Sequence, residues 1–588
     1  MATSSQTFER VSRFKGRVFE ALTFGASVTG ILALAALLIY VSIDAFDLAA
    51  ASPEWLLTYF GTLVVPYIGF CLYGANDREV TRLTLVVLGG GLVVNAVGFT
   101  FIESFLRDIP RLNWQLSYLF TVVFPVTGYA TVAGSQGRVG AVGLGVLTRI
   151  LGGAAFALWI FVLFVVLDSR LWYLVYTVGV LPGSLLTVYG RWRSRSLVVK
   201  LGGAVGVAGI VGAYFARPII AVYPTTVFIY IWTLVVPLTA FVTFRTARQW
   251  DLTSGALVGG AILLVSVGGT VVLGGGTLTG GANLLVLFGI ALPTVTYVHG
   301  TLRKRDGVEG LLLPVLLVGG VFLGAYLVRS FGVPAPNPWL DLSYVQGTPT
   351  TQALRARSAG FFPPIVGSVI IISIVAVLSF VLGVGTAVFL EEYTSNTGFV
   401  GALARLLQVN IANLAAVPSV VYGLLGLGLF VQTLGLGLGT AVSASLTLSL
   451  LILPITVISA QEAIRSVPDD LRDGSLAMGA TRWQTTKNIV LPEAMPGILT
   501  GVILALGRAI GETAPLIMIG MAAISFSPPN SIWSQFGAMP MMIYQWANNV
   551  NADFRFGVVA AGVLTLLFIL LAMNATAIII RNKYERGT

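Results

Sequence analysis

Charged residues are scarce in this chain. Asp, Glu, Lys and Arg make up 10% of its 588 residues, whereas about a quarter of a soluble domain is charged. Hydrophobic residues make up 56%, and they gather in runs long enough for membrane helices, which need roughly 20 mostly apolar residues each. The runs are continuous and do not alternate with polar residues as the strands of a membrane barrel would. The sequence therefore predicts an all-α polytopic membrane protein.

Cysteine and histidine are nearly absent and occur only as Cys71 and His299. One residue of each kind cannot form a disulfide within the chain or a Cys/His metal site. No lysine directly follows a glycine, which excludes the ATPase phosphate-binding loop G-x-x-x-x-G-K-[S/T]. We therefore expect no bound metal or cofactor and no enzymatic activity. The energy for any active process must come from a partner.

Basic residues exceed acidic ones and give a net charge of +10. Most Arg residues lie in loops at the ends of apolar runs, which is typical of a topology signal, so we expect no nucleic-acid partner. Arg10, Arg13, Lys15 and Arg17 precede the first run, at 21–45. That run is too long for the apolar core of a signal peptide. It predicts a retained helix in the plasma membrane, with the N-terminus in the cytoplasm.

Hydropathy indicates about sixteen spans, an even number that also places the C-terminus in the cytoplasm. The first is 21–45, and ten more lie between about 56 and 329. Five follow, at about 364–390, 409–434, 440–460, 497–524 and 558–580.

The ten-span block has an internal repeat. A proline recurs near the middle of every second span, at steps of 59, 57, 55 and 56 residues, and a glycine pair follows each in the next span. Such a fixed period predicts about five helical hairpins in the same orientation. The prolines are Pro66, Pro125, Pro182, Pro237 and Pro293, and the pairs are Gly89–Gly90, Gly152–Gly153, Gly202–Gly203, Gly259–Gly260 and Gly319–Gly320.

The loops within these hairpins are more basic than the loops between them, as expected if the hairpin loops are cytoplasmic. Because the block has an even number of spans, it leaves everything downstream on its original side. The hairpin loops hold Arg78, Arg82, Arg138, Arg191, Arg193, Arg195, Lys200, Arg245, Arg248, Arg303, Lys304 and Arg305, against Arg107, Arg111, Arg170 and Arg217 in the others.

A charged segment at 462–497, between two spans, carries the most informative motif. Gly479 allows a tight turn between two short helical stretches, and Pro492 is expected to close the second. The segment resembles the cytoplasmic loop of ABC importer permeases, which reads EAA, three residues, Gly, nine residues, I-x-L-P. The resemblance implies that this loop docks on a separate ATPase. Its positions here are Asp473, Gly474 and Ser475 in place of EAA, then Gly479 with Ala480 beside it, and Ile489, Leu491 and Pro492.

Two opposite charges lie within the predicted span at 497–524. Arg508 and Glu512 are four residues apart, so they share a helix face, and charges near the middle of a span are functional candidates. A guanidinium suits the oxygens of a phosphate, and Glu512 would orient it or accept a proton from the ligand. The other interpretation is an ion pair that only holds helices together.

The string RAIGETAPL, at 508–516, resembles the signature of PstA-type phosphate permeases, with Thr513 inside it. Three more segments are similar to that family: FPPIVGSVIIISIV at 362–375, FLEEY at 389–393 and NLAAVPSVVYG at 413–423. The resemblance implies a phosphate importer with a six-helix ABC permease core. It also implies a PstC-like permease partner, two ATP-binding subunits that use the ATP, and an extracytoplasmic phosphate-binding protein.

The resemblance covers about 336–588 and divides the chain into three parts. Residues 1–50 hold the tail and the probable first core helix, 51–335 form the inserted block, and 336–588 form the permease core; the span at 310–329 is the other candidate for the first core helix. The spans of the block hold no Lys, have acidic residues only at their edges and contain one Arg, Arg149, which favours a scaffold, membrane-lipid or docking role over a second transport path. Two alternative functions stay open: a permease for another oxyanion or solute, and a membrane scaffold or sensor with a degenerate core.

Overall fold

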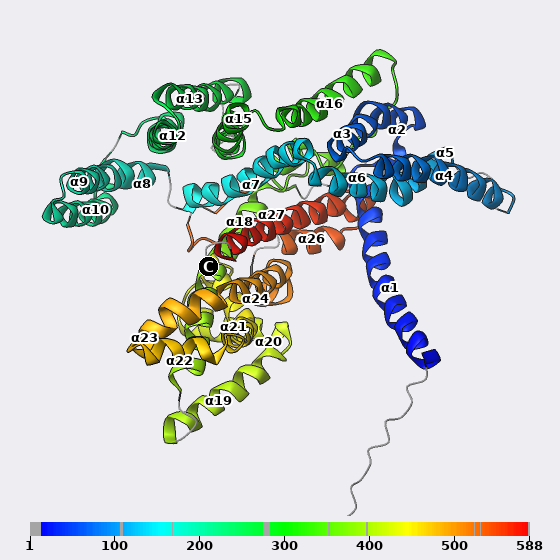
Figure 1. The fold of residues 1–588 in the computed structure, drawn as a ribbon. Helices are drawn as coiled ribbons and strands as arrows, with labels where there is room; N and C mark the ends of the chain where they lie inside the picture. Colours follow the sequence, from blue (N-terminus) through cyan, green and yellow to red (C-terminus); the bar gives the residue numbers. More distant parts are fainter. Residues whose placement is uncertain are drawn as a thin grey trace, which may run out of the picture.

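The computed structural model describes residues 13–105, 110–166, 169–220, 222–274, 283–350, 353–394, 398–521, 524–529 and 531–585. These ranges are almost wholly helical (Figure 1), and fifteen of their helices are long and apolar enough to cross a membrane. The all-α polytopic fold is thus confirmed. The predicted tail before residue 13, with Arg10, lies outside the described residues.

The inserted block contains ten long helices in five hairpins, as predicted. Each hairpin pairs a proline-containing helix with a second helix that carries the glycine pair. The first helices are α2–α3 (Pro53–Ala75), α5–α6 (Arg111–Gln136), α8–α9 (Ser169–Trp192), α11–α12 (Thr226–Gln249) and the one ending in α15 (Leu285–Lys304). The second helices are α4 (Arg78–Glu103), α7 (Arg138–Val166), α10 (Ser196–Ala216), α13 (Leu252–Gly274) and α16 (Leu312–Ser330).

A π-helical turn precedes the proline in every hairpin. Proline has no N–H, and its ring clashes with the carbonyl four residues back; a π-turn shifts the bonding to five residues and lets the helix continue. Each of the first four turns contains a threonine. These threonines recur in the sequence at steps of 59, 56 and 56 residues, so they are a second repeated residue beside the proline. The turns are Phe60–Val64, Leu119–Val123, Val175–Val180, Ile231–Val235 and Leu285–Ala291, and the threonines are Thr62, Thr121, Thr177 and Thr233.

The glycine pairs mark close helix contacts in four of the five hairpins. A Cβ on Gly320 would lie 2.4 Å from the Thr62 carbonyl oxygen, so α16 of the last hairpin packs tightly on the first hairpin. Gly153 of α7 approaches the backbone of Phe288 in the same way. By contrast, a Cβ on Gly89 or Gly90 would meet nothing within 4 Å, so the first pair has no such packing role.

The two ends of the block lie next to each other. The Ser52 hydroxyl donates to the Pro334 carbonyl at 2.9 Å, and the amide of Trp339 donates to Ala45 at the end of α1 (Arg13–Ala45), also at 2.9 Å. Arg357 lies over the Trp339 ring at 3.5 Å and pairs with Asp47 at 3.4 Å. The chain therefore leaves and re-enters the same small region.

Packing separates the two candidates for the first core helix. α1 packs against α27 (Val559–Glu585) at the C-terminal end of the chain. α16, the other candidate, packs against α2, α3 and α7 within the block. This arrangement favours α1. The block itself touches the core through α7, which packs against α27 and α18 (Phe362–Val388).

The core is built around α18 and α21 (Ala441–Arg465), with α24 (Leu491–Gly511) packed on both. Its largest buried apolar cluster draws only on residues between Tyr344 and Met573, and the buried clusters of the block are separate from it. The remaining α-helices of the core are α17 (Leu342–Gln346), α19 (Gly398–Ala415), α20 (Ser419–Gly426), α22 (Asp469–Ala477), α23 (Arg482–Thr485), α25 (Ala514–Met518) and α26 (Met539–Ala547).

Two of the predicted core spans are wrong. The span at 409–434 is two helices, because α19 ends at Ala415 and Pro418 prevents the helix from continuing. α20 starts at Ser419 and continues through a π-turn to Thr433. The span at 497–524 begins earlier, at Arg482, and ends at Gly511. Pro515 accounts for that end: it has no N–H to donate to the Gly511 carbonyl, and its ring would clash with that carbonyl in a continuous helix.

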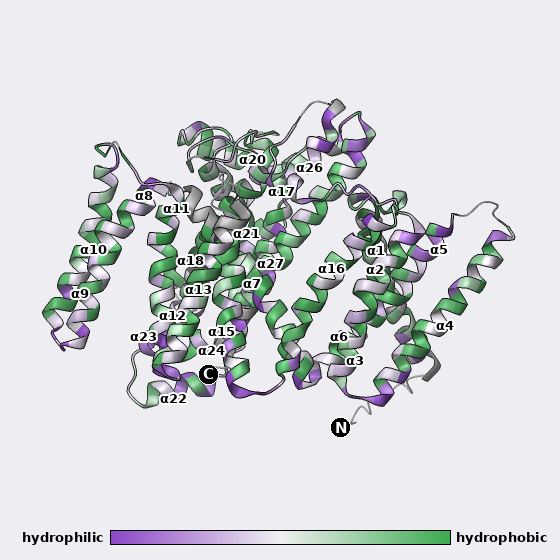
Figure 2. Ribbon diagram, turned by 90° about the horizontal axis from the view of Figure 1, so that it is seen from above, coloured by the Kyte–Doolittle hydropathy of each residue, from purple (hydrophilic) through white to green (hydrophobic). Residues whose placement is uncertain are grey.

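The predicted sidedness within the molecule is confirmed. Figure 2 shows α22 and α23 at the same edge as the C-terminus and as the turns after α9, α12 and α15. Those turns carry the basic residues of the last three hairpin loops. The 462–497 segment and the basic hairpin loops therefore lie on one face of the molecule, called the α22 face below.

Close contact at Gly134 gives a test of the block's packing. A Cβ there would lie 2.8 Å from the Cys71 carbonyl oxygen, whereas Gly128 on the same helix has nothing within 4 Å. We expect Gly134→Ala to destabilise the purified protein by about 1–3 kcal/mol because α3 and α6 must separate. Thermal unfolding in detergent measures this, with Gly128→Ala as the matched control. Equal melting temperatures for the two variants would contradict the packing.

Candidate functional site

The 462–497 segment forms a helix–turn–helix on the α22 face. α22 ends at Ala477, and Gly479 turns the chain with φ +85, a conformation that costs other residues about 1–2 kcal/mol. Thr481 then caps α23 in a capping box: its hydroxyl accepts from the Gln484 amide, and its own amide donates to the Gln484 side chain at 2.8 Å. The predicted turn between two short helices is confirmed.

The three residues in place of EAA have different surroundings. Asp473 and Gly474 are exposed on α22, and a Cβ on Gly474 would meet nothing within 4 Å. Ser475 is buried, and its hydroxyl shares a 2.9 Å hydrogen bond with the Thr485 hydroxyl. That bond ties α22 to α23. A serine at position 475 can form this bond, whereas the alanine of the EAA pattern would leave the buried Thr485 hydroxyl without it.

The end of the motif lies inside a helix. Ile489 stands in a π-turn (Thr486–Val490), and Leu491 and Pro492 open α24 directly after it. The helix runs without a break from Arg482 to Gly511, so the expectation that Pro492 closes a short helix is wrong. Proline has no N–H for the usual bond to the carbonyl four residues back, and the π-turn shifts the bonding to five residues, so the helix continues through Pro492. Ala480, at the other end of the motif, is partly buried beside Gly479.

A cluster of ion pairs anchors this helix–turn–helix to the core. Glu391, at the end of α18, binds Arg465 at 2.6 Å and the Gln461 amide at 2.7 Å. Glu392 binds Arg472 at 3.3 Å. Arg472 also donates to the Ile464 and Val467 carbonyls at 2.7 and 2.6 Å, which lie at and just beyond the end of α21.

No role was predicted from the sequence for the residues of this cluster, and the string FLEEY served only as a family resemblance. Two adjacent acids at a helix end, with arginines downstream, were the available signal.

Large apolar side chains are exposed on the α22 face. Met478 is 84% exposed and Trp483 is 57% exposed, although both lie at the end of the molecule where the charged residues gather. Leu471 and Leu476 on α22 are also exposed. Exposed apolar side chains that lie together on a polar face are typical of a protein–protein contact.

Arg508 and Glu512 form the predicted ion pair, with Nε and Oε1 3.1 Å apart. Their position differs from the prediction, because Arg508 lies in the last turn of α24 and Glu512 is its C-cap, with extended backbone. The pair is thus at a helix break and not in the middle of a continuous helix. The Arg508 side chain is half exposed, whereas that of Glu512 is 16% exposed. Thr513, next in the chain, is partly buried.

The short helix α25 after the break is held by α20 and by the loop that follows it. A Cβ on Gly423 of α20 would lie 2.7 Å from Pro515. The Gly439 amide donates to the Ile519 carbonyl at 3.0 Å. These close contacts surround the broken backbone with protein, and irregular backbone within a membrane requires such burial or a water-filled lining.

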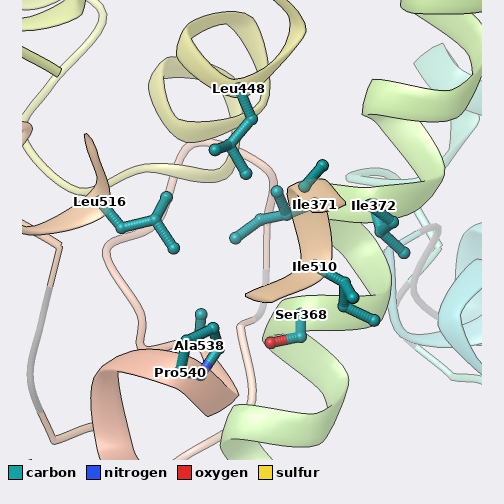
Figure 3. A pocket seen from close by; sticks show the side chains of 9 residues that line it. Ser368, Ile371, Ile372, Leu448, Ile510, Leu516, Ala538 and Pro540 are labelled. Atoms are coloured by element: carbon teal, nitrogen blue, oxygen red, sulfur yellow. The ribbon is translucent and has the colours of Figure 1, made fainter. Parts of the chain in front are cut away.

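A small cavity lies beside the break, lined by Ser368, Ile371, Leu448, Ile510 and Leu516 among others (Figure 3). Its volume of about 10 Å³ is close to the least that holds one water molecule. Its walls are apolar, and the Ser368 hydroxyl already accepts from the Met539 amide at 2.8 Å. The cavity therefore does not fit an oxyanion, and the ion pair remains the better candidate.

The comparisons with known proteins agree with this core. The sequence pattern of binding-protein-dependent transport system inner membrane components matches residues 379–583. The phosphate transport system permease protein PstA 1 of Mycobacterium tuberculosis (strain CDC 1551 / Oshkosh) is 34% identical over 226 residues, which cover 38% of this chain and 71% of the relative. The chain belongs to the PstA family of ABC transporter permeases.

Other relatives and one solved structure are also similar. PstA of Xylella fastidiosa (strain 9a5c) is 32% identical over 249 residues, which cover 42% of this chain and 83% of the relative. An inward-facing structure of the MetNI methionine ABC transporter covers 38% of this chain and 97% of its own, at 18% identity and a TM-score of 0.32.

PstA-family membership makes this chain a multi-pass membrane transport component, and its relatives are permeases and not enzymes. Permeases of this class work with separate ATPases and a substrate-binding protein. The family match begins at residue 379, so the block lies outside it.

The two glycines of the PstA-family loop offer a matched test of its geometry. Gly479→Ala should destabilise the turn by about 1–2 kcal/mol because φ is positive there. Gly474→Ala should stabilise α22 by about 0.5–1 kcal/mol, since the site is helical and open. Hydrogen exchange of residues 469–486 measures both effects in the purified chain. Faster exchange in Gly474→Ala, or unchanged exchange in Gly479→Ala, would contradict the loop structure.

Proposed function

We propose that this chain is the transmembrane permease subunit of an ATP-driven phosphate importer and forms half of its translocation pathway. The observation that carries the proposal is the Arg508–Glu512 pair at the break of α24 in a PstA-family core. The relatives' names specify phosphate transport, and the chemistry of the pair suits that anion.

Arg508 has unused hydrogen-bond donors. Its Nε bonds to Glu512, while its two Nη groups bond to nothing among the described residues. These two groups form the planar fork that binds two oxygens of a phosphate at once. A lysine would offer only a point charge in the same place.

Glu512 fixes the guanidinium and sets the charge of the site. An uncompensated arginine would hold an anion tightly, and a transport site must also release its substrate. The carboxylate moderates the positive charge and can accept a proton from hydrogen phosphate. The Thr513 hydroxyl adds a neutral donor beside it.

The helix–turn–helix on the α22 face is the proposed contact with an ATPase. Asp473 has no ion pair among the described residues and is free for a partner, and Met478 and Trp483 provide exposed apolar surface next to it. Motion of α22 would pass through Arg472 and Glu392 to α18 and through the continuous helix to Arg508.

The complete assembly contains this chain, a PstC-like permease, two ATP-binding subunits and an extracytoplasmic phosphate-binding protein. The ATPases lie in the cytoplasm, so the α22 face and both chain ends are cytoplasmic. ATP is used by the partners, and this chain binds no cofactor.

Loss of the guanidinium should stop transport. We expect Arg508→Ala to lower ATP-dependent uptake of radiolabelled phosphate by about 10- to 100-fold, the effect of losing charge-assisted hydrogen bonds worth about 1.5–3 kcal/mol. Arg508→Lys should restore only part of it. Proteoliposomes that contain the full assembly give the measurement.

The matched control is Arg329→Ala, since Arg329 is also an exposed arginine in the last turn of a helix, α16, but lies in the block. It should transport normally. Normal uptake by Arg508→Ala would show that the pair is structural. A wild-type assembly that moves sulfate or molybdate and no phosphate would overturn the substrate.

A charge at the exposed apolar residue Met478 on the α22 face should weaken binding of the ATPase. We expect Met478→Asp to lower co-purification of the ATP-binding subunits at least about tenfold, because burying an unpaired carboxylate at a contact is strongly unfavourable. Asn488→Asp adds the same charge at an exposed position of the following π-turn and should retain them. Full ATPase retention by Met478→Asp would refute this contact.

A further inference from the structure

A large cavity of the block lies between its fourth and fifth hairpins. It has a volume of about 570 Å³, which is within the range of ligand pockets. α12 and α15 form its sides, α7 closes one wall with Gly153 and Phe156, and Val258 of α13 completes the lining. Figure 1 shows α12, α13 and α15 grouped together, away from α22 and α24.

The cavity is polar at one end. Arg245, Gln249, Trp250 and His299 line it where α12 and α15 approach the α22 face. Arg245 forms no hydrogen bond or ion pair with any described residue, and neither does the Gln249 side chain. An exposed, uncompensated cation thus stands at the mouth of the cavity.

The neighbouring charges do not neutralise Arg245. Asp251, the nearby acid in the chain, caps α13: the Ser254 amide and the Thr253 hydroxyl donate to it at 2.6 and 2.8 Å. These bonds hold the pKa of the Asp251 carboxyl well below its usual value. Its other oxygen binds Arg303 at 2.6 Å. Asp251 is therefore ionised but fully engaged, and Arg245 remains available.

The other end of the cavity is apolar and reaches toward the middle of the helices. Phe156, Phe241 and Phe288 line it, with Leu292 and Pro293 from the π-turn region of the last hairpin. A free inorganic anion gains nothing from such walls and would lose its hydration. An acyl chain matches them.

We propose that this cavity binds an anionic phospholipid, with the phosphate headgroup at Arg245 and an acyl chain among Phe156, Phe241 and Phe288. Trp250 and His299 provide the amphipathic groups that suit the headgroup level of a bilayer. Basic pockets between membrane helices on the cytoplasmic side are suited to anionic headgroups. A bound lipid would contact α7, the helix through which the block packs on α18 and α27.

Lipid binding to the full-length chain in detergent tests this proposal. Native mass spectrometry with phosphatidylglycerol should show one tightly retained molecule, and phosphatidylcholine should be retained more weakly. Arg245→Gln should weaken phosphatidylglycerol binding about fivefold, the effect of about 1 kcal/mol per basic residue near a headgroup. Val242→Phe, which fills part of the apolar lining, should weaken both lipids.

The control is Arg248→Gln, which removes the same charge from the same helix end. Arg248 does not line the cavity and lies over the Phe244 ring, so its loss should leave binding unchanged. Three results would overturn the proposal: equal weakening by Arg245→Gln and Arg248→Gln, equal retention of the two lipids by the wild type, or competition by inorganic phosphate that removes the lipid.

Discussion

Every backbone N–H and C=O inside a membrane must find a partner within the protein, and this constraint determines where the helices of this chain bend, break or continue. Prolines are the points of conflict, because each removes one donor. In the block the conflict is resolved within the helix: a π-turn stands before each of the five repeated prolines, and the helix still crosses. In the core, Pro418 and Pro515 break the helix instead. At the Pro515 break, the backbone is surrounded by α20 and the loop after it.

The same constraint joins the two parts of the functional site. Pro492 follows a π-turn, so one helix of 30 residues runs from Arg482 to Gly511, a length of about 45 Å. The α22 face is at its start and Arg508 at its end. This continuous helix contains the π-turn Thr486–Val490 and Pro496 between its two ends. The break before Pro515 then separates this helix from α25, with Glu512 and Thr513 at the boundary.

Local features of the sequence predicted most of the fold, and the misses are two helix breaks at prolines and the long-range ion pairs. Hydropathy located all ten helices of the block, and the proline period identified its hairpins, because both signals repeat at short range. The motif spacing placed Gly479 at a turn for the same reason. The break at Pro418 was overlooked because the apolar run continues through it. The pairing of Glu391 with Arg465 joins residues 74 positions apart, and nothing local in a single sequence specifies such a pair. The helix end next to Arg508 was not predicted because the apolar run continues past Pro515.

The geometry of the block explains how a core of this family tolerates so large an addition. Ser52 and Pro334 are in hydrogen-bond contact, so the chain that enters the block leaves it at nearly the same point, and α1 keeps its place against α27. Ten crossings return the chain to its starting side, which leaves the α22 face unchanged. The buried apolar clusters of block and core are separate, so neither depends on the other for its interior. Among the described helices of the block, α7 is the one with extensive packing on α18 and α27. It is therefore the main direct contact between the block and these two core helices.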